Sequence, residues 1–302
     1  MNQHGSNMPA AEVELSVDLV RRMVAAQFPQ YADLEVVEVA NGWDNVVYRL
    51  GDDLGLRVPR RQMGADLIEN EVALLPLVAP DLPLPVPAAL HVGEPQFGYP
   101  WRWTICPWFE GRHMGLQPPA DAQGAARDLA AFLAALHRPF PAAPANPFGR
   151  GAPLSERDEL TRQRIELTVP EAQRRQALDL WQLCLAAPVW DGPPMLLHGD
   201  MHVMNLVVDY QRLVAVIDFG DICGGDPACD MAVAWMFPDA ECTSQFRAAL
   251  ARAGGAADDA TWRRALGWAL GFAVTYLANS ADHPELNQIG RHTLERALLW
   301  SA

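Results

Sequence analysis

Two short segments hold the side chains whose types and spacing could carry out chemistry. The first is HGDMHVMN, residues 198–205, and the second is IDFGD, residues 217–221. Each comes at the end of an apolar stretch typical of a strand, so its polar residues are expected in a loop that can face a cleft. Asp200, Asn205 and Asp218 are the candidate functional residues of these two segments.

These residue types suit the transfer of a phosphoryl group from a nucleotide to a hydroxyl. That reaction needs a carboxylate to accept the hydroxyl proton and divalent cations to bridge the phosphates. Mg²⁺ prefers hard oxygen ligands and keeps several waters, so one carboxylate and one amide oxygen can hold it. Asp200 can then be the base, with Asn205 and Asp218 as metal ligands. An Asp-x₄-Asn loop followed by Asp-Phe-Gly also matches the layout of protein kinases, although the loop begins His-Gly-Asp.

The combination resembles the aminoglycoside phosphotransferase family of small-molecule antibiotic kinases, which shares the protein-kinase-like fold. The motif HGDxHxxN is followed, 13 residues after its Asn, by DFG. The likeness runs from about residue 34 to residue 234. It implies an enzyme that uses ATP or GTP with Mg²⁺ and phosphorylates a hydroxyl of a small molecule, such as an aminoglycoside, conferring resistance by O-phosphorylation.

Supporting residues follow from the same resemblance. The segment GDPACD, residues 225–230, resembles the GDPxxD segment of the family. This implies that Asp230 supports the catalytic loop through hydrogen bonds, and we expect His198 to orient that loop. Asp221 could assist metal or water binding or cap a helix, and His202 could face the acceptor or simply pack.

The residues expected to hold the phosphates match the family less closely. The sequence contains no lysine, and all 23 basic residues are arginine. The family places a lysine on its third strand, paired with a helix glutamate; the matching residues here are Arg57 and Glu71, with Glu69 as the lesser choice. Arginine grips phosphate oxygens bidentately, so the electrostatic role can survive with altered geometry. Alternatively, Arg57 only extends from an edge strand.

Two backbone regions are expected to contact the nucleotide. The turn that contains Gly42 and Asn45 has a single glycine instead of G-x-G-x-x-G, so backbone amides and asparagine side chains would meet phosphate. By resemblance, residues 107–111 form a hinge whose backbone meets the purine, including Pro107 and Phe109.

The elements that must position these residues divide into two lobes. Residues 15–106 predict a nucleotide-binding lobe, a small antiparallel sheet with one helix. Residues 112–302 predict a mostly helical lobe that holds the catalytic loop and the acceptor site, with helices at about 120–138, 156–166, 171–187, 243–253, 259–279 and 285–300. The predicted fold class is therefore α+β, bilobal and protein-kinase-like. Residues 1–14 are expected to be a flexible leader.

Composition excludes several classes of protein. A formal net charge of −14 argues against a nucleic-acid partner, which would need clustered Arg and Lys. The five cysteines are scattered without CxxC spacing, which favours buried free thiols. The longest apolar run is too short to span a bilayer, and the N-terminus lacks a signal peptide, so a cytoplasmic monomer or homodimer without a membrane partner is expected.

Three alternatives remain open. A kinase of the same family could act on a macrolide, peptide or nucleoside antibiotic or on a metabolic alcohol. The absence of lysine could indicate a non-catalytic nucleotide-binding pseudokinase. Finally, His198, Asp200 and His202 could belong to a metal hydrolase, which would leave Asn205 and the DFG segment unexplained.

Overall fold

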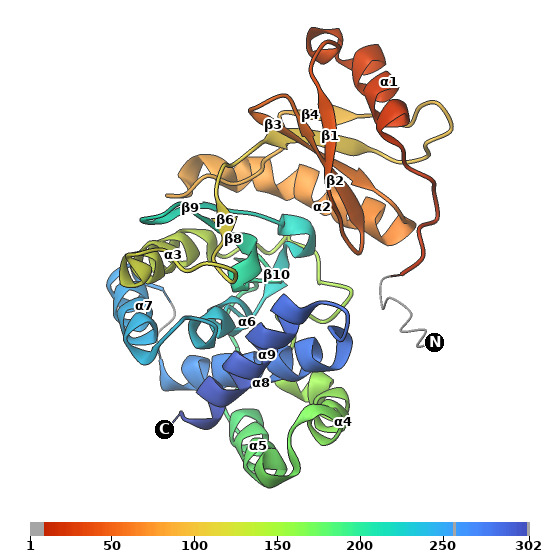
Figure 1. Ribbon diagram of the computed structural model, residues 1–302. Helices are drawn as coiled ribbons and strands as arrows, with labels where there is room; N and C mark the ends of the chain where they lie inside the picture. Colours follow the sequence, from red (N-terminus) through yellow and green to blue (C-terminus); the bar gives the residue numbers. More distant parts are fainter. Residues whose placement is uncertain (1–8, 256–257, 301–302) are drawn as a thin grey trace.

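The computed structural model describes residues 9–255 and 258–300. A β-rich N-terminal lobe lies against a larger, mostly helical lobe (Figure 1). The predicted α+β, bilobal class is confirmed. Part of the expected leader, residues 1–8, lies outside the described residues. At its described end, Glu12 accepts a hydrogen bond from the Gln62 backbone N–H at 3.0 Å, so this stretch is tied to the lobe.

The N-terminal lobe is an antiparallel sheet whose described strands are ordered β1-β2-β3-β5-β4. Its strands are β1 (Val36–Asn41), β2 (Asn45–Leu50), β3 (Leu54–Pro59), β4 (His91–Gly93) and β5 (Trp103–Pro107). Arg57 lies opposite Val47 of β2 and Thr104 of β5. Arg57 therefore lies on a central strand, so the alternative that it only extends from an edge strand is wrong.

Two helices accompany this sheet. Helix α1 (Val17–Gln27) begins where Ser16 accepts a hydrogen bond from the Leu19 backbone N–H at 3.2 Å, as its N-cap position predicts. Its apolar side packs with the strands in a core of its own, formed by Val20, Met23, Val24, Val36, Val46, Tyr48, Leu50, Leu56, Val58, Tyr99, Trp103 and Ile105. Helix α2 (Gln62–Val78) lies on the side of the sheet that faces the other lobe (Figure 1).

Helix α2 joins the lobes through its second half. Leu74, Leu75 and Val78 belong to the hydrophobic core of the larger lobe, whereas the strands above them have the separate core. The helix also packs against the DFG segment. Glu71 is therefore carried by an element that is buried against both lobes.

The larger lobe is built around α8, and most residues of this helix are buried. Its helices are α3 (Ala122–Leu136), α4 (Asp158–Thr168), α5 (Glu171–Leu185), α6 (Ala228–Met231), α7 (Ala240–Arg252), α8 (Asp259–Asn279) and α9 (Pro284–Leu298). Helices α4 and α5 cover the far side of α8 (Figure 1). The described helices cover the predicted ranges, with ends displaced by a few residues.

Short strands position the two chemical segments. They are β6 (Arg112–His113), β7 (Met195–Leu197), β8 (Leu206–Val208), β9 (Leu213–Val216) and β10 (Cys223–Gly225). Residues 198–205 run from β7 to β8, and the DFG segment runs from β9 to β10. Both segments therefore stand at strand ends, as predicted.

All five cysteines are free and buried, which confirms the prediction of free thiols. Burial raises the pKa of the Cys106 thiol to about 12, so this group stays protonated. Within the described ranges, the structure has no helix that is long and apolar enough to cross a membrane.

Candidate active site

A glycine allows the two chemical segments to meet. Gly199 has a φ of +86°, a left-handed conformation that L side chains rarely adopt. A Cβ atom at this position would lie 2.2 Å from the backbone oxygen of Asp221. The HGD and DFG loops therefore approach each other at a point where no side chain fits.

The base of the catalytic loop is held by Asp230 of α6. Its carboxylate accepts hydrogen bonds from the backbone N–H groups of His198 at 2.8 Å and Gly199 at 2.9 Å, and it lies 3.0 Å from Nε2 of His137. The His198 ring bridges the two loops, because Nε2 lies 2.9 Å from the Ile217 oxygen and Nδ1 accepts from the Asp200 N–H at 3.2 Å. Asp230 is fully buried, and these contacts are of the kind that the resemblance implied.

Asp200 lies between two cationic or polar side chains. Its Oδ1 atom is 2.9 Å from Nη2 of Arg150, and its Oδ2 atom is 3.4 Å from Nε2 of His202. Burial would raise the pKa of the Asp200 carboxyl, but Arg150 and then His202 hold it well below its usual range. Asp200 is therefore ionised at neutral pH, as a proton acceptor must be.

Arg150 is a residue of this site that sequence reasoning missed. It lies in the loop between α3 and α4, between Gly149 and Gly151, whose φ values are +69° and +71°. Its guanidinium stands 4.7 Å from the ring centroid of Phe272 on α8. An arginine flanked by two glycines was a visible signal, but nothing in the sequence connected it with Asp200, 50 positions away.

Two oxygen donors suit a divalent cation. The Nδ2 group of Asn205 donates to the Asp200 carbonyl at 3.0 Å, which leaves Oδ1 of Asn205 for another partner. Asp218 has a φ of +65°, uncommon for a residue other than glycine, and its carboxylate is 57% exposed. A hard carboxylate and an amide oxygen fit Mg²⁺. Among the described residues, no cluster of three or more His, Cys, Asp or Glu side chains forms a metal site.

Arg57 links α2 to the DFG segment. Its Nη1 atom donates to Glu71 at 2.6 Å, and its Nη2 atom donates to Asp218 at 2.8 Å. Burial alone would lower the pKa of Arg57, but Glu71 and then Asp218 raise it above its usual value. The predicted Arg57–Glu71 pair is therefore present, and the arginine also contacts the candidate metal ligand.

Asp221 lies close to the same group. Its Oδ1 atom accepts a hydrogen bond from Asn146 Nδ2 at 2.7 Å. Burial, followed by the nearby charge of Asp200, raises the pKa of the Asp221 carboxyl, while Arg150 opposes the shift. Asp221 thus shares the electrostatic environment of Asp200. His202 packs edge-on against Tyr276, with 5.8 Å between ring centroids, and also faces Asp200.

The turn between β1 and β2 is fastened to the N-terminal lobe. The Gly42 N–H donates to the Asn45 oxygen at 2.9 Å, and Arg60 donates to the Gly42 oxygen at 3.0 Å. A Cβ atom at Gly64 of α2 would lie 2.3 Å from the Asp44 oxygen, so this glycine lets the turn rest on the helix. Oδ1 of Asn45 is buried and has no hydrogen-bond partner. Sequence reasoning did not single out Arg60.

The hinge segment follows β5. Pro107 is the last residue of that strand and lies opposite Leu54, and the Trp108 N–H donates to the Asp53 oxygen at 2.8 Å. Phe109 is half-buried and follows directly. A hollow of about 280 Å³ lies beside this segment, lined by Glu110, Gly111, Arg112, Gln117, Pro118, Val208, Asp209 and Tyr210. Within the described residues, no hydrogen bond or ion pair joins Gly42, Asn45, Pro107 or Phe109 to Asp200.

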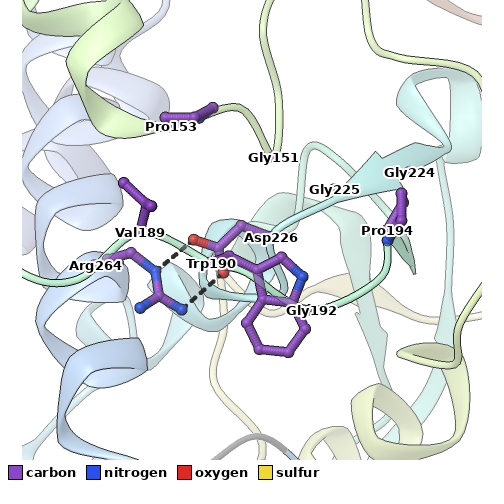
Figure 2. A pocket seen from close by; sticks show the side chains of 10 residues that line it. All are labelled: Gly151, Pro153, Val189, Trp190, Gly192, Pro194, Gly224, Gly225, Asp226 and Arg264. Atoms are coloured by element: carbon purple, nitrogen blue, oxygen red, sulfur yellow. Dashed lines mark hydrogen bonds and ion pairs between the residues drawn. The ribbon is translucent and has the colours of Figure 1, made fainter.

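A second hollow, of about 130 Å³, is lined in part by Gly151 and Pro153 (Figure 2). Its charged groups are Asp226 and Arg264, which face each other from the end of β10 and from α8. Nε of Arg264 donates to Oδ2 of Asp226 at 2.6 Å, and Nη2 donates to Oδ1 at 3.2 Å. Gly151 borders the same hollow. Because the two charges satisfy each other, this pair anchors α8 to the segment that precedes Asp230.

The fold and this arrangement of loops define a phosphotransferase with a kinase-like architecture. The model of the phosphotransferase enzyme family matches residues 35–268, and the chain belongs to this family. The resemblance to aminoglycoside phosphotransferases is thereby confirmed at the level of the family.

Solved structures share the fold over nearly the whole chain. The GDP complex of wild-type aminoglycoside 2'-phosphotransferase-IIIa is 22% identical, covers 94% of this chain and 99% of its own, and has a TM-score of 0.70. Macrolide 2'-phosphotransferase type I is 20% identical, with coverages of 94% and 99% and a TM-score of 0.65. Macrolide 2'-phosphotransferase MphH from Brachybacterium faecium is 21% identical, with coverages of 92% and 97% and a TM-score of 0.62. No curated protein matches the chain.

Proposed function

We propose that this chain transfers the γ-phosphate of ATP or GTP to a hydroxyl of a small molecule, with Asp200 as the catalytic base. The observation that carries the proposal is the position of Asp200. It is an ionised carboxylate held 2.9 Å from Arg150 and 3.4 Å from His202, in the loop that also contains Asn205. The adjoining DFG segment supplies the second oxygen donor.

The N-terminal lobe would bind the nucleotide. Arg57, held by Glu71, would neutralise the inner phosphates, because a guanidinium can contact two phosphate oxygens at once. The turn at Gly42 and Asn45 would cover the phosphates. The unpartnered Oδ1 of Asn45 supports a role there, because a buried polar atom gains from a partner. The hinge from Pro107 to Phe109 would meet the purine.

Asn205 and Asp218 would hold Mg²⁺, which supplies charge neutralisation at the phosphates when it is bound. Asp218 is prepared for this role because Arg57 fixes one of its oxygens. Asp230 and His198 would keep the catalytic loop in place, since their hydrogen bonds fix the backbone on the N-terminal side of Asp200.

In the transfer step, the acceptor oxygen forms a bond to the γ-phosphorus as the bond from that phosphorus to the bridging oxygen breaks. The nucleoside diphosphate leaves, and the acceptor proton passes to a carboxylate oxygen of Asp200. Arg150 and His202 hold that carboxylate, so positioning accounts for much of the catalysis. Asp221 and His202 would face the acceptor.

The class of acceptor is less constrained than the reaction. Solved phosphotransferases with this fold include enzymes named for aminoglycosides and for macrolides, which motivates an antibiotic acceptor and a role in resistance. A metabolic alcohol is the alternative. Ionised Asp200 disfavours the alternative of a non-catalytic nucleotide-binding protein, since a proton acceptor is in place.

The test is transfer of labelled γ-phosphate from ATP and from GTP, with Mg²⁺, to a panel of aminoglycosides, macrolides, other antibiotics and small alcohols. Asp200→Asn should lower turnover by roughly 10²–10⁴-fold, because the proton acceptor is lost, while nucleotide binding stays nearly intact. Asp179→Asn, an exposed aspartate on α5, is the matched control. Equal turnover of Asp200→Asn and wild type would remove Asp200 from the role of base. Nucleotide binding without transfer to any acceptor would contradict the proposed function.

A further inference from the structure

Three arginines stand over one side of α8, next to the catalytic loop. Arg150 lies 4.7 Å from the Phe272 ring centroid, and Arg157 lies 4.9 Å from that of Trp268. On the next turn of the helix, Arg164 donates to Oγ1 of Thr275 at 2.8 Å. We call Arg150, Arg157 and Arg164 the arginine row.

The arginine row is continuous with the catalytic site. Residues 268, 272 and 275 have the spacing of one helix face, and the rise of 1.5 Å per residue places all three within about 10 Å along α8. Phe272 stacks on Tyr276 at 6.0 Å between centroids, Tyr276 packs against His202, and His202 lies beside Asp200. The row therefore lies along the side of α8 that is connected to Asp200 through Phe272, Tyr276 and His202.

The outer two guanidiniums have no acidic partner among the described residues. Arg157 donates to the Phe148 carbonyl, and Arg164 donates to a hydroxyl. Asp158, which follows Arg157 in the sequence, instead binds Arg162 and the Trp181 indole. Burial, followed by the charge of Arg150, lowers the pKa of Arg157 and of Arg164. Arg150 is paired with Asp200, but in a chain with a net charge of −14 the half-buried guanidiniums of Arg157 and Arg164 are two positive charges without a carboxylate partner among the described residues.

Three acidic residues of this lobe, Asp239, Asp258 and Asp259, have partners of their own. Asp258 caps the start of α8 by accepting from the Thr261 N–H, and Asp259 pairs with Arg247. Seventeen residues of helix separate Asp259 from Tyr276, or about 25 Å. Asp239 caps α7 in the same way as Asp258 caps α8. Asp258 and Asp259 therefore lie at the end of α8 that is far from Tyr276, and Asp239 is engaged in capping α7.

We propose that the acceptor carries an anionic group, a carboxylate or a phosphate, which Arg157 and Arg164 bind while its hydroxyl lies at Asp200. Guanidinium groups favour such oxyanions through charge-assisted, often bidentate hydrogen bonds. The charges of Arg157 and Arg164 repel a polycation, so an aminoglycoside is disfavoured as the acceptor. This inference rests on the proposed function and narrows its substrate class.

The first test compares acceptors by charge. Labelled transfer is measured with hydroxy acids, sugar phosphates, neutral polyols and aminoglycosides. We expect Asp200-dependent labelling of an anionic hydroxy compound. Arg157→Gln with Arg164→Gln should raise the KM for that compound by roughly tenfold to a hundredfold, since hydrogen bonds to charged groups are lost. The matched control Arg175→Gln removes an exposed arginine of α5 and should not change this KM.

Labelling confined to neutral or polycationic acceptors would overturn the inference and leave the proposed function standing. Labelling of no acceptor would count against the proposed function itself.

The second test needs no turnover. The thermal unfolding midpoint is measured with millimolar citrate or inorganic phosphate at constant ionic strength, with Mg²⁺ and ADP or GDP at saturation to fill the nucleotide site. Citrate tests carboxylate recognition and phosphate tests phosphate recognition. Wild type and Arg175→Gln should be stabilised equally by at least one anion, and the double variant should lose that stabilisation. The single variants Arg157→Gln and Arg164→Gln are measured alongside, in case the double variant does not fold. No stabilisation of wild type, or equal stabilisation of the double variant, would overturn the anion site.

Discussion

At the scale of single residues, Arg57 shows how a chain without lysine can satisfy two partners at once. Its two Nη atoms reach Glu71 on α2 and Asp218 of the DFG segment at 2.6 and 2.8 Å. A guanidinium is planar and presents its donors in a fixed fork, so both contacts can form together. The sequence predicted the pair with Glu71. It could not predict the contact with Asp218, because that contact depends on how the two lobes close on each other.

Replacement of Arg57 by lysine tests this double contact. An ammonium is a single point charge on a flexible stem, so in this buried position it cannot reproduce both contacts of the fork. We therefore expect Arg57→Lys to lower kcat/KM for the nucleotide by about tenfold or more, given the usual strength of charge-assisted hydrogen bonds. Steady-state kinetics with varied nucleotide measures the change, and Arg102→Lys, a more exposed arginine of the same lobe, is the control. A variant as efficient as wild type would show that the fork is not required.

At the scale of elements, the sequence predicted the loops that follow β7 and β9. It predicted only some of the residues that hold these loops in place. The apolar stretches before His198 and before Asp218 form β7 and β9, since short apolar runs bounded by polar residues favour strands. The family resemblance pointed to Asp230 as a support. Arg150, His137 and Asn146 were not predicted, because their roles come from long-range contacts that local spacing does not encode. Asp239, Asp258 and Asp259 of the larger lobe cap helices or pair at the surface, which their position in the sequence alone did not show.

Asp230 allows the bracing of the catalytic loop to be measured. In Asp230→Asn one oxygen acceptor becomes an NH₂ donor that faces backbone N–H groups, so at least one buried hydrogen bond is lost. We expect a loss of about 1–3 kcal/mol in the free energy of unfolding at pH 7, together with lower turnover. Urea denaturation measures the first effect, with Asp179→Asn on the surface as the control.

The pH dependence gives a second criterion for Asp230. Burial would raise the pKa of this carboxyl, but the hydrogen bond with His137 and further contacts lower it below the usual value. A lowered folded-state pKa contributes stability above the unfolded pKa of about 3.9, and this stability is lost as the pH falls through the folded value. Asp230→Asn lacks this contribution, so its stability should change less than that of wild type on acidification below about pH 4. Parallel acid profiles for the two proteins would contradict the assignment.

At the scale of the whole molecule, α2 connects the two lobes, because it contacts β3, where Arg57 pairs with Glu71, and its end enters the core of the larger lobe. The sheet and α1 have their own core, yet Leu74, Leu75 and Val78 at the end of α2 are part of the core of the larger lobe. The sequence predicted two lobes and placed α2 in the first one, because the chain order suggests it. The direction in which the second half of α2 packs depends on how the lobes meet. A helix shared in this way couples the lobes in stability as well as in position.

This coupling predicts that the chain unfolds in one cooperative transition. Leu75 is fully buried in the larger core, and Leu75→Ala should lower the free energy of unfolding by about 2–5 kcal/mol, the usual cost of a buried Leu→Ala change. Leu77, two positions along the same helix, is 59% exposed, so Leu77→Ala should have little effect. In scanning calorimetry we expect a single peak for all three proteins, shifted to lower temperature only in Leu75→Ala. Two resolved peaks, one of them unmoved by Leu75→Ala, would mean that the sheet and its core unfold independently and that α2 does not couple the lobes.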